Sequence, residues 1–301
     1  MLTIVQAALE AGFLYAPIAL ALFLSFSILN IADMTTDGAF VLGSAVSAMM
    51  CLAGHPILAL PAGMAASAAA GFITAFLQTK LAVPSILAGI VTNIGLYSIN
   101  LMVMGKSNQS LFQTDTIYTM AKDAGFAGSW YELAVTAIIV LALCALLVLF
   151  LGTRLGLSIR ATGDNADMVR ASSINPTFTI TVGLCVANAM TGLSGAMVAQ
   201  YSTFADVNSG TGMVVLALAA LVIGETLIGK GSMTRRVLGV VAGSIIYRFI
   251  YAAALRFNVP ADYMKLVSAV IVGVAIAAPA VRRWAAFQMQ KRRALAGRRG
   301  E

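Results

Sequence analysis

The chain has 301 residues, of which 60% are hydrophobic and only 10% are charged, whereas soluble domains carry about 25% charged residues. This composition excludes an ordinary soluble domain and indicates an integral membrane protein. The net charge of +7 does not indicate nucleic-acid binding, because seven of the 19 Lys and Arg residues fall within the last twenty positions, directly after an apolar run.

Nine apolar runs follow one another along the chain, each bounded by Gly, Pro or charged residues. A transmembrane helix needs about 20 apolar residues, and the second and seventh runs are short for a full span, which puts the count at eight to ten helices. The sequence therefore predicts an all-α integral membrane protein with about nine transmembrane helices. The runs cover residues 11–29, 38–52, 56–76, 84–104, 133–151, 178–201, 213–228, 237–255 and 264–281.

The stretch NIADMTTDGAFVLGSAV interrupts the apolar pattern with two aspartates and two threonines. One interpretation is local: a side-chain oxygen of Thr35, Thr36 or Asp37 caps the helix that begins near Gly38. The other is functional: the break faces a central path, where helix N-termini and polar side chains meet a solute. The candidate path residues in this break are Asn30, Asp33, Thr35, Thr36 and Asp37.

The distribution of Lys and Arg indicates the orientation in the membrane. With the N-terminus outside, fourteen of these residues fall on the inward side, including those of the basic tail 282–301. Four fall on the outward side, and Arg248 lies within a span. This asymmetry predicts a cytoplasmic C-terminus. The polar segment 105–132 then lies outside, and the polar segment 152–177 lies inside.

The inward polar segment has the pattern of a short helix that lies outside the bilayer. Asp164 can cap this helix with Asp167 at its third position, and Asn175, followed by a proline, ends it. Met168 and Val169 give the helix a small apolar surface. A plain solvated loop would account for the charges but would not need a capped helix with an apolar surface.

The same segment carries Gly156-Leu157, Arg160-Ala161, Gly163, Asn165, Arg170-Ala171 and Ile174-Asn175. In this order the residues resemble a motif of the permease subunits of ABC importers, in the family that includes branched-chain amino acid and ribose permeases. Ser173 stands where the family usually has Gly. The stretches ILNIADMTTDGAFVLG, VPSILAGIVTNIGLYSINLMVMGK and LSGAMVAQYSTFADVNSGTGM extend the resemblance over nearly the whole chain, and they look like the subgroup linked to uptake of aromatic amino acids or related small metabolites.

This resemblance implies that the segment is a coupling helix that docks on a separate cytoplasmic ATPase subunit. It also implies a multi-pass protein of the bacterial inner membrane, surrounded by lipid, whose partners are a second permease copy and an extracytoplasmic solute-binding protein. The ATPase subunit then uses ATP and Mg²⁺, and this chain binds no cofactor. The residues expected to form the ATPase contact are Arg160, Gly163, Asp164, Asn165, Asp167, Met168, Arg170, Ile174 and Asn175.

The stretch FADVNSGTGMVVLALAAL loosely repeats the first break, with Ala205-Asp206 matching Ala32-Asp33 before a polar run, a Gly and an apolar helix. The helix before Asp33 is predicted to run inward and the helix before Asp206 outward, which indicates an inverted repeat of the kind that many transporters use. The predicted transmembrane domain 1–281 then consists of repeats over 11–104 and 178–281, a linking helix over 133–151 and the coupling loop over 152–177.

The second break adds three candidate path residues, Asp206, Asn208 and Ser209. As in the first break, a local interpretation stands beside the functional one. Asn208, Ser209 and Thr211 can cap the helix that starts at Met213. No catalytic or metal-binding residue is predicted in either break.

Two charges, Glu225 and Arg248, lie within apolar runs, where charged residues usually pair with each other or serve in function. They either pair across neighbouring helices or take a direct part in transport. An ion-coupled secondary transporter is the alternative to the ABC permease, and it would use Asp33, Asp206 or Glu225 as ion ligands. A channel is the third possibility.

Two stretches resemble motifs of enzymes, but each lacks a residue type that the motif requires. The stretch GETLIGKG nearly matches a phosphate-binding loop, but Gly231 stands where a Ser or Thr must hold Mg²⁺. Ser194, in the stretch GLSG, has no base to accept its proton, because the only histidine, His55, lies in a predicted turn near the outer surface. ATP hydrolysis is therefore expected in another polypeptide.

Overall fold

The computed structural model describes residues 2–256 apart from 124, 126, 127, 129 and 230, together with the single positions 266, 269, 270, 273, 274 and 277. The predicted helix over 264–281 falls largely outside these described residues. The predicted basic tail 282–301 falls entirely outside them.

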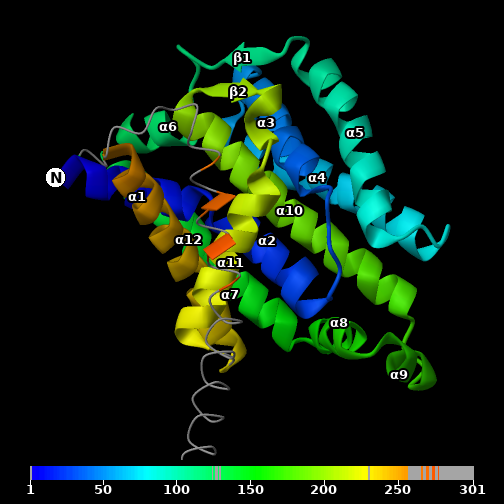
Figure 1. Cartoon of the computed structure of the whole chain (residues 1–301). Coiled ribbons are helices and arrows are strands. Elements are labelled where there is room, and N and C mark those ends of the chain that lie inside the picture. Colours follow the sequence, from blue (N-terminus) through cyan, green and yellow to red (C-terminus); the bar gives the residue numbers. More distant parts are fainter. Residues whose placement is uncertain are drawn as a thin grey trace, which may run out of the picture.

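The described chain is a bundle of helices with one short two-stranded ribbon (Figure 1). The strands, β1 (Asn108–Ser110) and β2 (Phe204–Asp206), pair antiparallel and join the segments that follow α5 and α10. The helices are α1 (Leu2–Leu14), α2 (Ala16–Leu22), the π-helix η1 (Phe23–Ile28), α3 (Thr36–Leu52), α4 (Pro56–Thr79), α5 (Ser85–Met104), α6 (Ile117–Asp123), α7 (Tyr131–Gly152), α8 (Arg154–Asp164), α9 (Ala166–Ala171), α10 (Pro176–Ser202), the 3-10 helix η2 (Val207–Gly210), α11 (Met213–Ile228) and α12 (Met233–Arg256).

The prediction of a helical membrane protein is confirmed apart from the short ribbon, and eight of the nine apolar runs form helices in the described part. Seven helical segments there are long and apolar enough to cross a membrane. The eighth, α3, has only 17 residues and follows an irregular segment at 30–33. The seven long segments are Ile4–Ile28, Pro56–Thr79, Ser85–Met104, Tyr131–Gly152, Pro176–Ser202, Val207–Ile228 and Met233–Arg256.

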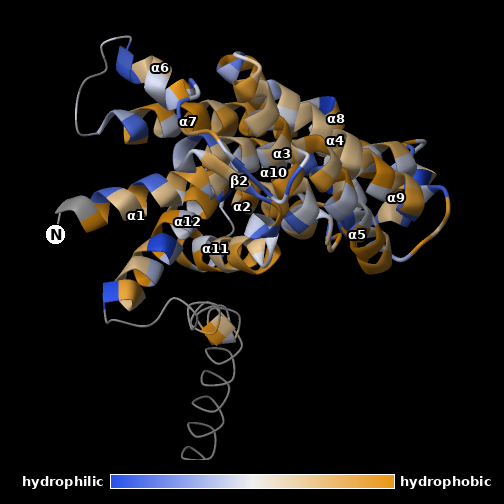
Figure 2. Ribbon diagram, turned by 90° about the horizontal axis from the view of Figure 1, so that it is seen from above, coloured by the Kyte–Doolittle hydropathy of each residue, from blue (hydrophilic) through white to orange (hydrophobic). Residues whose placement is uncertain are grey.

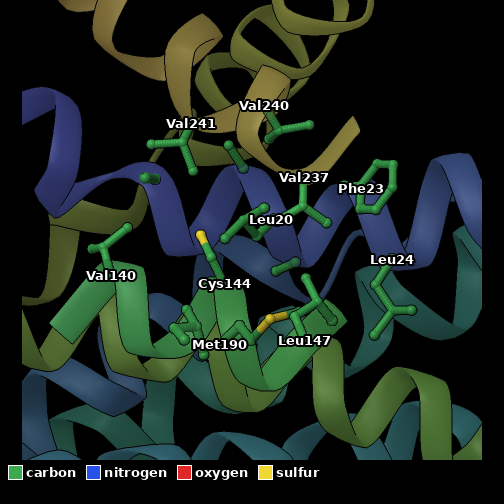
Figure 3. Close-up of a cluster of buried hydrophobic side chains, with 14 of the residues drawn as sticks. Leu20, Phe23, Leu24, Val140, Cys144, Leu147, Met190, Val237, Val240 and Val241 are labelled. Carbon is green, nitrogen blue, oxygen red and sulfur yellow. The ribbon is translucent and has the colours of Figure 1, made fainter. Parts of the chain in front are cut away.

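The first span lies at the centre of the bundle and consists of α1, α2 and η1 in succession. Every residue of α2 is buried. Leu20, Phe23 and Leu24 of this span pack with apolar side chains of α7, α10 and α12 (Figure 3). Burial against other helices rather than lipid explains why this span can contain a π-helical turn, since its polar backbone groups remain inside protein.

The longest helix, α10, packs along α3 and α4 at short distance through small residues. A Cβ on Gly195 would collide with the backbone carbonyl oxygen of Phe40 in α3. The small residues Gly183, Ala187, Thr191 and Gly195 recur every four positions along α10 and let neighbouring helices approach closely. Ser194 is buried beside it and donates a hydrogen bond to the carbonyl oxygen of Leu14 at 2.7 Å, which gives this serine a structural partner.

The outward-facing surfaces of α4, α5 and α7 expose large apolar side chains. Much of these helices is orange, the colour of hydrophobic residues, in Figure 2. Such surfaces fit lipid or another membrane protein rather than water. The two long polar segments lie at opposite ends of the bundle, with β1 and β2 at one end and α8 and α9 at the other (Figure 1).

Candidate functional site

The two polar breaks meet in the structure. The carboxylate of Asp37, in the first turn of α3, accepts hydrogen bonds from the backbone N–H groups of Gly212 at 3.1 Å and Val214 at 2.9 Å. It thereby caps the N-terminus of α11, which lies far along the chain from α3. A carboxylate at this position also interacts favourably with the helix dipole.

This contact replaces the local caps that the sequence predicted. Thr35 is the N-cap residue of α3 and Gly212 that of α11, but neither makes a side-chain cap hydrogen bond. The prediction that each break caps its own helix is therefore wrong. Asp37 points toward α11 instead, because the two helices begin beside each other.

The rest of the first break is fixed inside the protein. Asp33 is 3% exposed and accepts hydrogen bonds from the backbone N–H of Thr35 at 2.9 Å and from Nδ2 of Asn188 in α10 at 2.7 Å. The hydroxyls of Thr35 and Thr74 in α4 lie 2.7 Å apart, and Thr36 is buried too. These contacts hold the irregular segment against α4 and α10, so these buried polar groups have protein partners instead of lipid.

A cavity of about 450 Å³ lies between the start of α3, one side of α5 and the segment 207–211. Of the predicted path residues, Asp37 and Asn208 line this cavity. It is lined by Asp37, Gly38, Val41, Asn93, Ile94, Tyr97, Ser98, Asn100, Val207, Asn208, Gly210 and Thr211.

The polar side of α5 was not predicted from the sequence. Asn93, Tyr97 and Asn100 recur at intervals of four and three residues, the spacing of one helix face. That periodicity was present within the apolar run 84–104 and would have indicated a polar face. Ser98 adds a hydroxyl to the same cavity wall.

The remaining candidate path residues lie outside the cavity lining. Asn30 is exposed and adopts a left-handed backbone conformation with φ 56°, which Asn tolerates better than most residues. Asp206 accepts a hydrogen bond from the backbone N–H of Asn208 at 2.6 Å, and the Ser209 hydroxyl donates to the Asp206 carbonyl at 2.7 Å. Asp206 and Ser209 thus shape the turn that places Asn208 at the cavity.

The predicted coupling segment forms two helices, α8 and α9, that meet at Asn165. The Asn165 side chain accepts hydrogen bonds from the backbone N–H groups of Asp167 at 3.1 Å and Met168 at 3.0 Å. The N-cap of α9 is therefore Asn165 and not Asp164. Asp164 is instead the last residue of α8, so its backbone is helical, whereas Asn165 has the extended backbone that an N-cap requires.

The short helix α9 presents a mixed polar and apolar surface. Met168 is 62% exposed, and Asp167 and Arg170 form an exposed ion pair at 3.5 Å. Val169 is buried and anchors α9. Asn175, predicted to end the helix, instead caps α10 by accepting a hydrogen bond from the backbone N–H of Thr177 at 3.0 Å. The candidate ATPase contacts that are exposed in the structure are Asp164, Asn165, Asp167, Met168, Arg170 and Asn175, whereas Arg160, Gly163 and Ile174 are half-buried.

The helix α8 is tied to the C-terminal end of the first span. A Cβ on Gly163 would collide with the backbone of Ile28 and Leu29, so the two backbones touch at this point. The hydroxyls of Thr162 and Thr179 lie 2.8 Å apart and join α8 to α10. The segment that begins at Leu29 leads directly to Asp33 and Asp37.

Ser173, which stands where the family usually has Gly, adopts φ 60° in the turn between α9 and α10. This left-handed conformation costs a residue with a Cβ about 1 kcal/mol or more relative to Gly. We expect Ser173→Gly to raise the midpoint of thermal unfolding in detergent. Ser172→Gly is the control, because Ser172 has φ −88°. An equal or larger gain in the control would contradict this explanation.

Glu225 and Arg248 do not pair with each other. Glu225 forms an ion pair with Arg236 at 2.8 Å, and Ser27 in η1 donates a hydrogen bond to Glu225 at 2.6 Å. The Arg248 guanidinium lies 3.7 Å from the centre of the Tyr15 ring, a cation–π contact. Both intramembrane charges thus have partners within the protein, and pairing between the two, one of the predicted alternatives, is wrong.

Comparison with known proteins gives one family and several relatives. The family model of the permease component of branched-chain amino acid transport systems matches residues 4–276. A tyrosine transport system permease protein of Clostridioides difficile is 32% identical over 84% of this chain and 84% of its own length. A ribose import permease protein of Escherichia coli K12 is 26% identical over 81% of this chain and 75% of its own length.

Among solved structures, an ABC transporter of the metal-chelate type in an inward-facing conformation has a TM-score of 0.51. Its sequence identity is 12%, and the alignment covers 93% of this chain and 85% of that one. At this identity the likeness concerns the fold alone.

Proposed function

This chain belongs to the family of branched-chain amino acid transport permease components and is a permease subunit of an ABC importer, and from this premise we propose that the cavity beside Asp37 lies on its translocation path. The supporting observation is the contact of the two polar breaks through Asp37. Transporters commonly bind solute where interrupted helices end inside the membrane. The solute would be small and amino acid-like, as the name of the tyrosine permease relative suggests.

The partners follow from the two ends of the bundle. We propose that α8 and α9 contact a separate ATPase subunit on the cytoplasmic side, where ATP and Mg²⁺ are used. A solute-binding protein would then dock at the opposite end, near β1 and β2. The chain would cross the bacterial inner membrane with its C-terminus in the cytoplasm.

A second copy of the chain is proposed to pack beside α5. This helix exposes Ile94 and Tyr97 next to the cavity, so a partner copy there would complete the wall of a shared path. The surfaces of α4 and α7 would face lipid. The inverted repeat of 11–104 and 178–281 belongs to the same proposal.

The ion-coupled alternative has less support. Asp33 already has hydrogen-bond donors from Thr35 and Asn188, and Glu225 already pairs with Arg236. Family membership provides an energy source in the partner ATPase, so these carboxylates need not bind a coupling ion.

Access to the cavity is expected to change with the nucleotide state of the partner ATPase. A cysteine at Asn208, in a variant without the three native cysteines, should react with a membrane-impermeant thiol reagent at a rate that changes roughly tenfold when ATP binds, because two conformations differ in population. A cysteine at Ser110 in β1 serves as the control. Equal rates at position 208 with and without ATP would argue against a path at this cavity.

A further inference from the structure

Resting on the proposed function, the structure assigns a subsite for a protonated amino group of the solute to Asp37 and Asn100, on the wall of the cavity. The path would therefore take cationic solutes, and solutes of zero net charge that carry a protonated amine, in preference to anions.

The first observation is an acceptor without a partner. Asn100 is 1% exposed, and its Nδ2 donates a hydrogen bond to the carbonyl oxygen of Gly38 at 3.2 Å. This bond fixes the orientation of the amide, since the reversed amide would set two oxygens against each other. The Oδ1 atom then has no hydrogen-bond partner among the described residues. The Oδ1 atom is itself buried, so a donor in the cavity would reach it after a small movement of the Asn100 side chain. Such a bond would satisfy an acceptor that is costly to leave without a partner.

The second observation is the unused capacity of Asp37. A carboxylate offers about four acceptor positions on its two oxygens. The N–H groups of Gly212 and Val214 each occupy one oxygen, which leaves further positions for a donor. The two hydrogen bonds from the start of α11 therefore use part of the acceptor capacity of Asp37 and leave the rest for a donor in the cavity.

The third observation is the charge of the cavity wall. None of the described residues that line the cavity is Lys, Arg or His, and Asp37 is the one carboxylate among them. The remaining polar groups are neutral amides and hydroxyls, such as Asn93 and Ser98. An ammonium group offers up to three donors and a compensating positive charge, which suits two acceptors of which one is charged.

The test uses two thiol reagents of similar size, aminoethyl and sulfonatoethyl methanethiosulfonate. A cysteine is placed at Ser98 in the full-length chain without its native cysteines, assembled with its ATPase in lipid vesicles. A cysteine at Ser110 reports the reagents' intrinsic preference. We expect the ratio of the aminoethyl to the sulfonatoethyl rate to be about tenfold higher at position 98 than at position 110.

Three variants decide the assignment. Asp37→Asn should abolish most of the increase in the ratio of aminoethyl to sulfonatoethyl rates at position 98, and Asp37→Glu should keep this increase. Asp115→Asn, which removes a carboxylate of the outer segment, should leave it unchanged. An equal loss in Asp37→Asn and Asp115→Asn would mean general surface charge and overturn the subsite, as would equal ratios at positions 98 and 110.

A competition experiment distinguishes a wall that binds an amine from a wall that contacts only water. Ethylammonium should slow modification at position 98 relative to the same concentration of sodium ions, whereas acetate should not, and Asn100→Leu should weaken the protection by ethylammonium. Absence of protection in the parent would overturn the proposal. Whether modification at position 98 blocks uptake is a separate readout: it tests the path itself, so the two proposals can fail independently.

Discussion

Gly163→Ala is expected to abolish most of the ATP-dependent change in access at a position-208 cysteine, reducing it about tenfold or more. The added Cβ would collide with the Ile28 carbonyl and the Leu29 backbone, and a backbone cannot move aside as a flexible side chain can. Overpacking of this kind typically costs about 1–3 kcal/mol. Relief of the collision requires α8 to move away from the C-terminal end of the first span.

The structure explains why this collision should matter for transport. Leu29 begins the segment that leads through Asp33, fixed to Asn188, to Asp37, which holds the start of α11 at the cavity. A displaced α8 would therefore no longer transmit movement of α9 to the cavity. Reagent access at position 208, compared with and without ATP, measures coupling between the two ends of this series of contacts.

Gly152→Ala is the matched control. Gly152 is the last residue of α7, two residues before α8 begins, and a Cβ there meets nothing within 4 Å. Both substitutions replace Gly by the better helix former Ala, which favours the helix by about 1 kcal/mol in each case. Helix propensity cannot explain a difference between them. Similar ATP-dependent access in the two variants would refute the coupling role of the contact between α8 and the first span.

The membrane class and the helical runs could be predicted because they depend on composition and on local apolar length. The short helix within 152–177 could be predicted because its signals are also local, although the cap falls on Asn165 rather than Asp164. A shift of one residue is ordinary at helix ends, where several polar side chains compete for the same N–H groups.

The connections between distant segments could not be predicted in the same way. Asp37 could have capped its own helix, and nothing in the local sequence shows that α11 begins beside it. The partner of Glu225 is Arg236, at the start of α12, and not Arg248 within it, because tertiary packing decides which charge lies opposite. The polar face of α5 had a visible periodicity, but its role depends on what the face meets.

Met168→Ala combined with Arg170→Ala is expected to weaken binding of the ATPase subunits by about tenfold or more, measured as the amount that co-purifies with the permease. An exposed apolar side chain beside an Arg is typical of residues that dominate a protein interface, and truncation of such residues costs about 2 kcal/mol or more. Neither side chain is needed for folding, since Val169 is the buried residue of α9 and the ion pair of Arg170 with Asp167 is exposed.

The matched control for the apolar part is Met102→Ala. Met102 is 80% exposed and lies in the last turn of α5, which leads to β1 at the opposite end of the bundle from α9. The double variant should keep its thermal unfolding midpoint, while ATP no longer alters reagent access at position 208. If the ATPase co-purifies in the same amount with the double variant and with Met102→Ala, the surface of α9 is not the docking site. The double variant could lose ATPase binding and also unfold at a lower temperature. In that case the single variant Arg170→Ala, which removes only an exposed charge, decides between a folding defect and a lost contact.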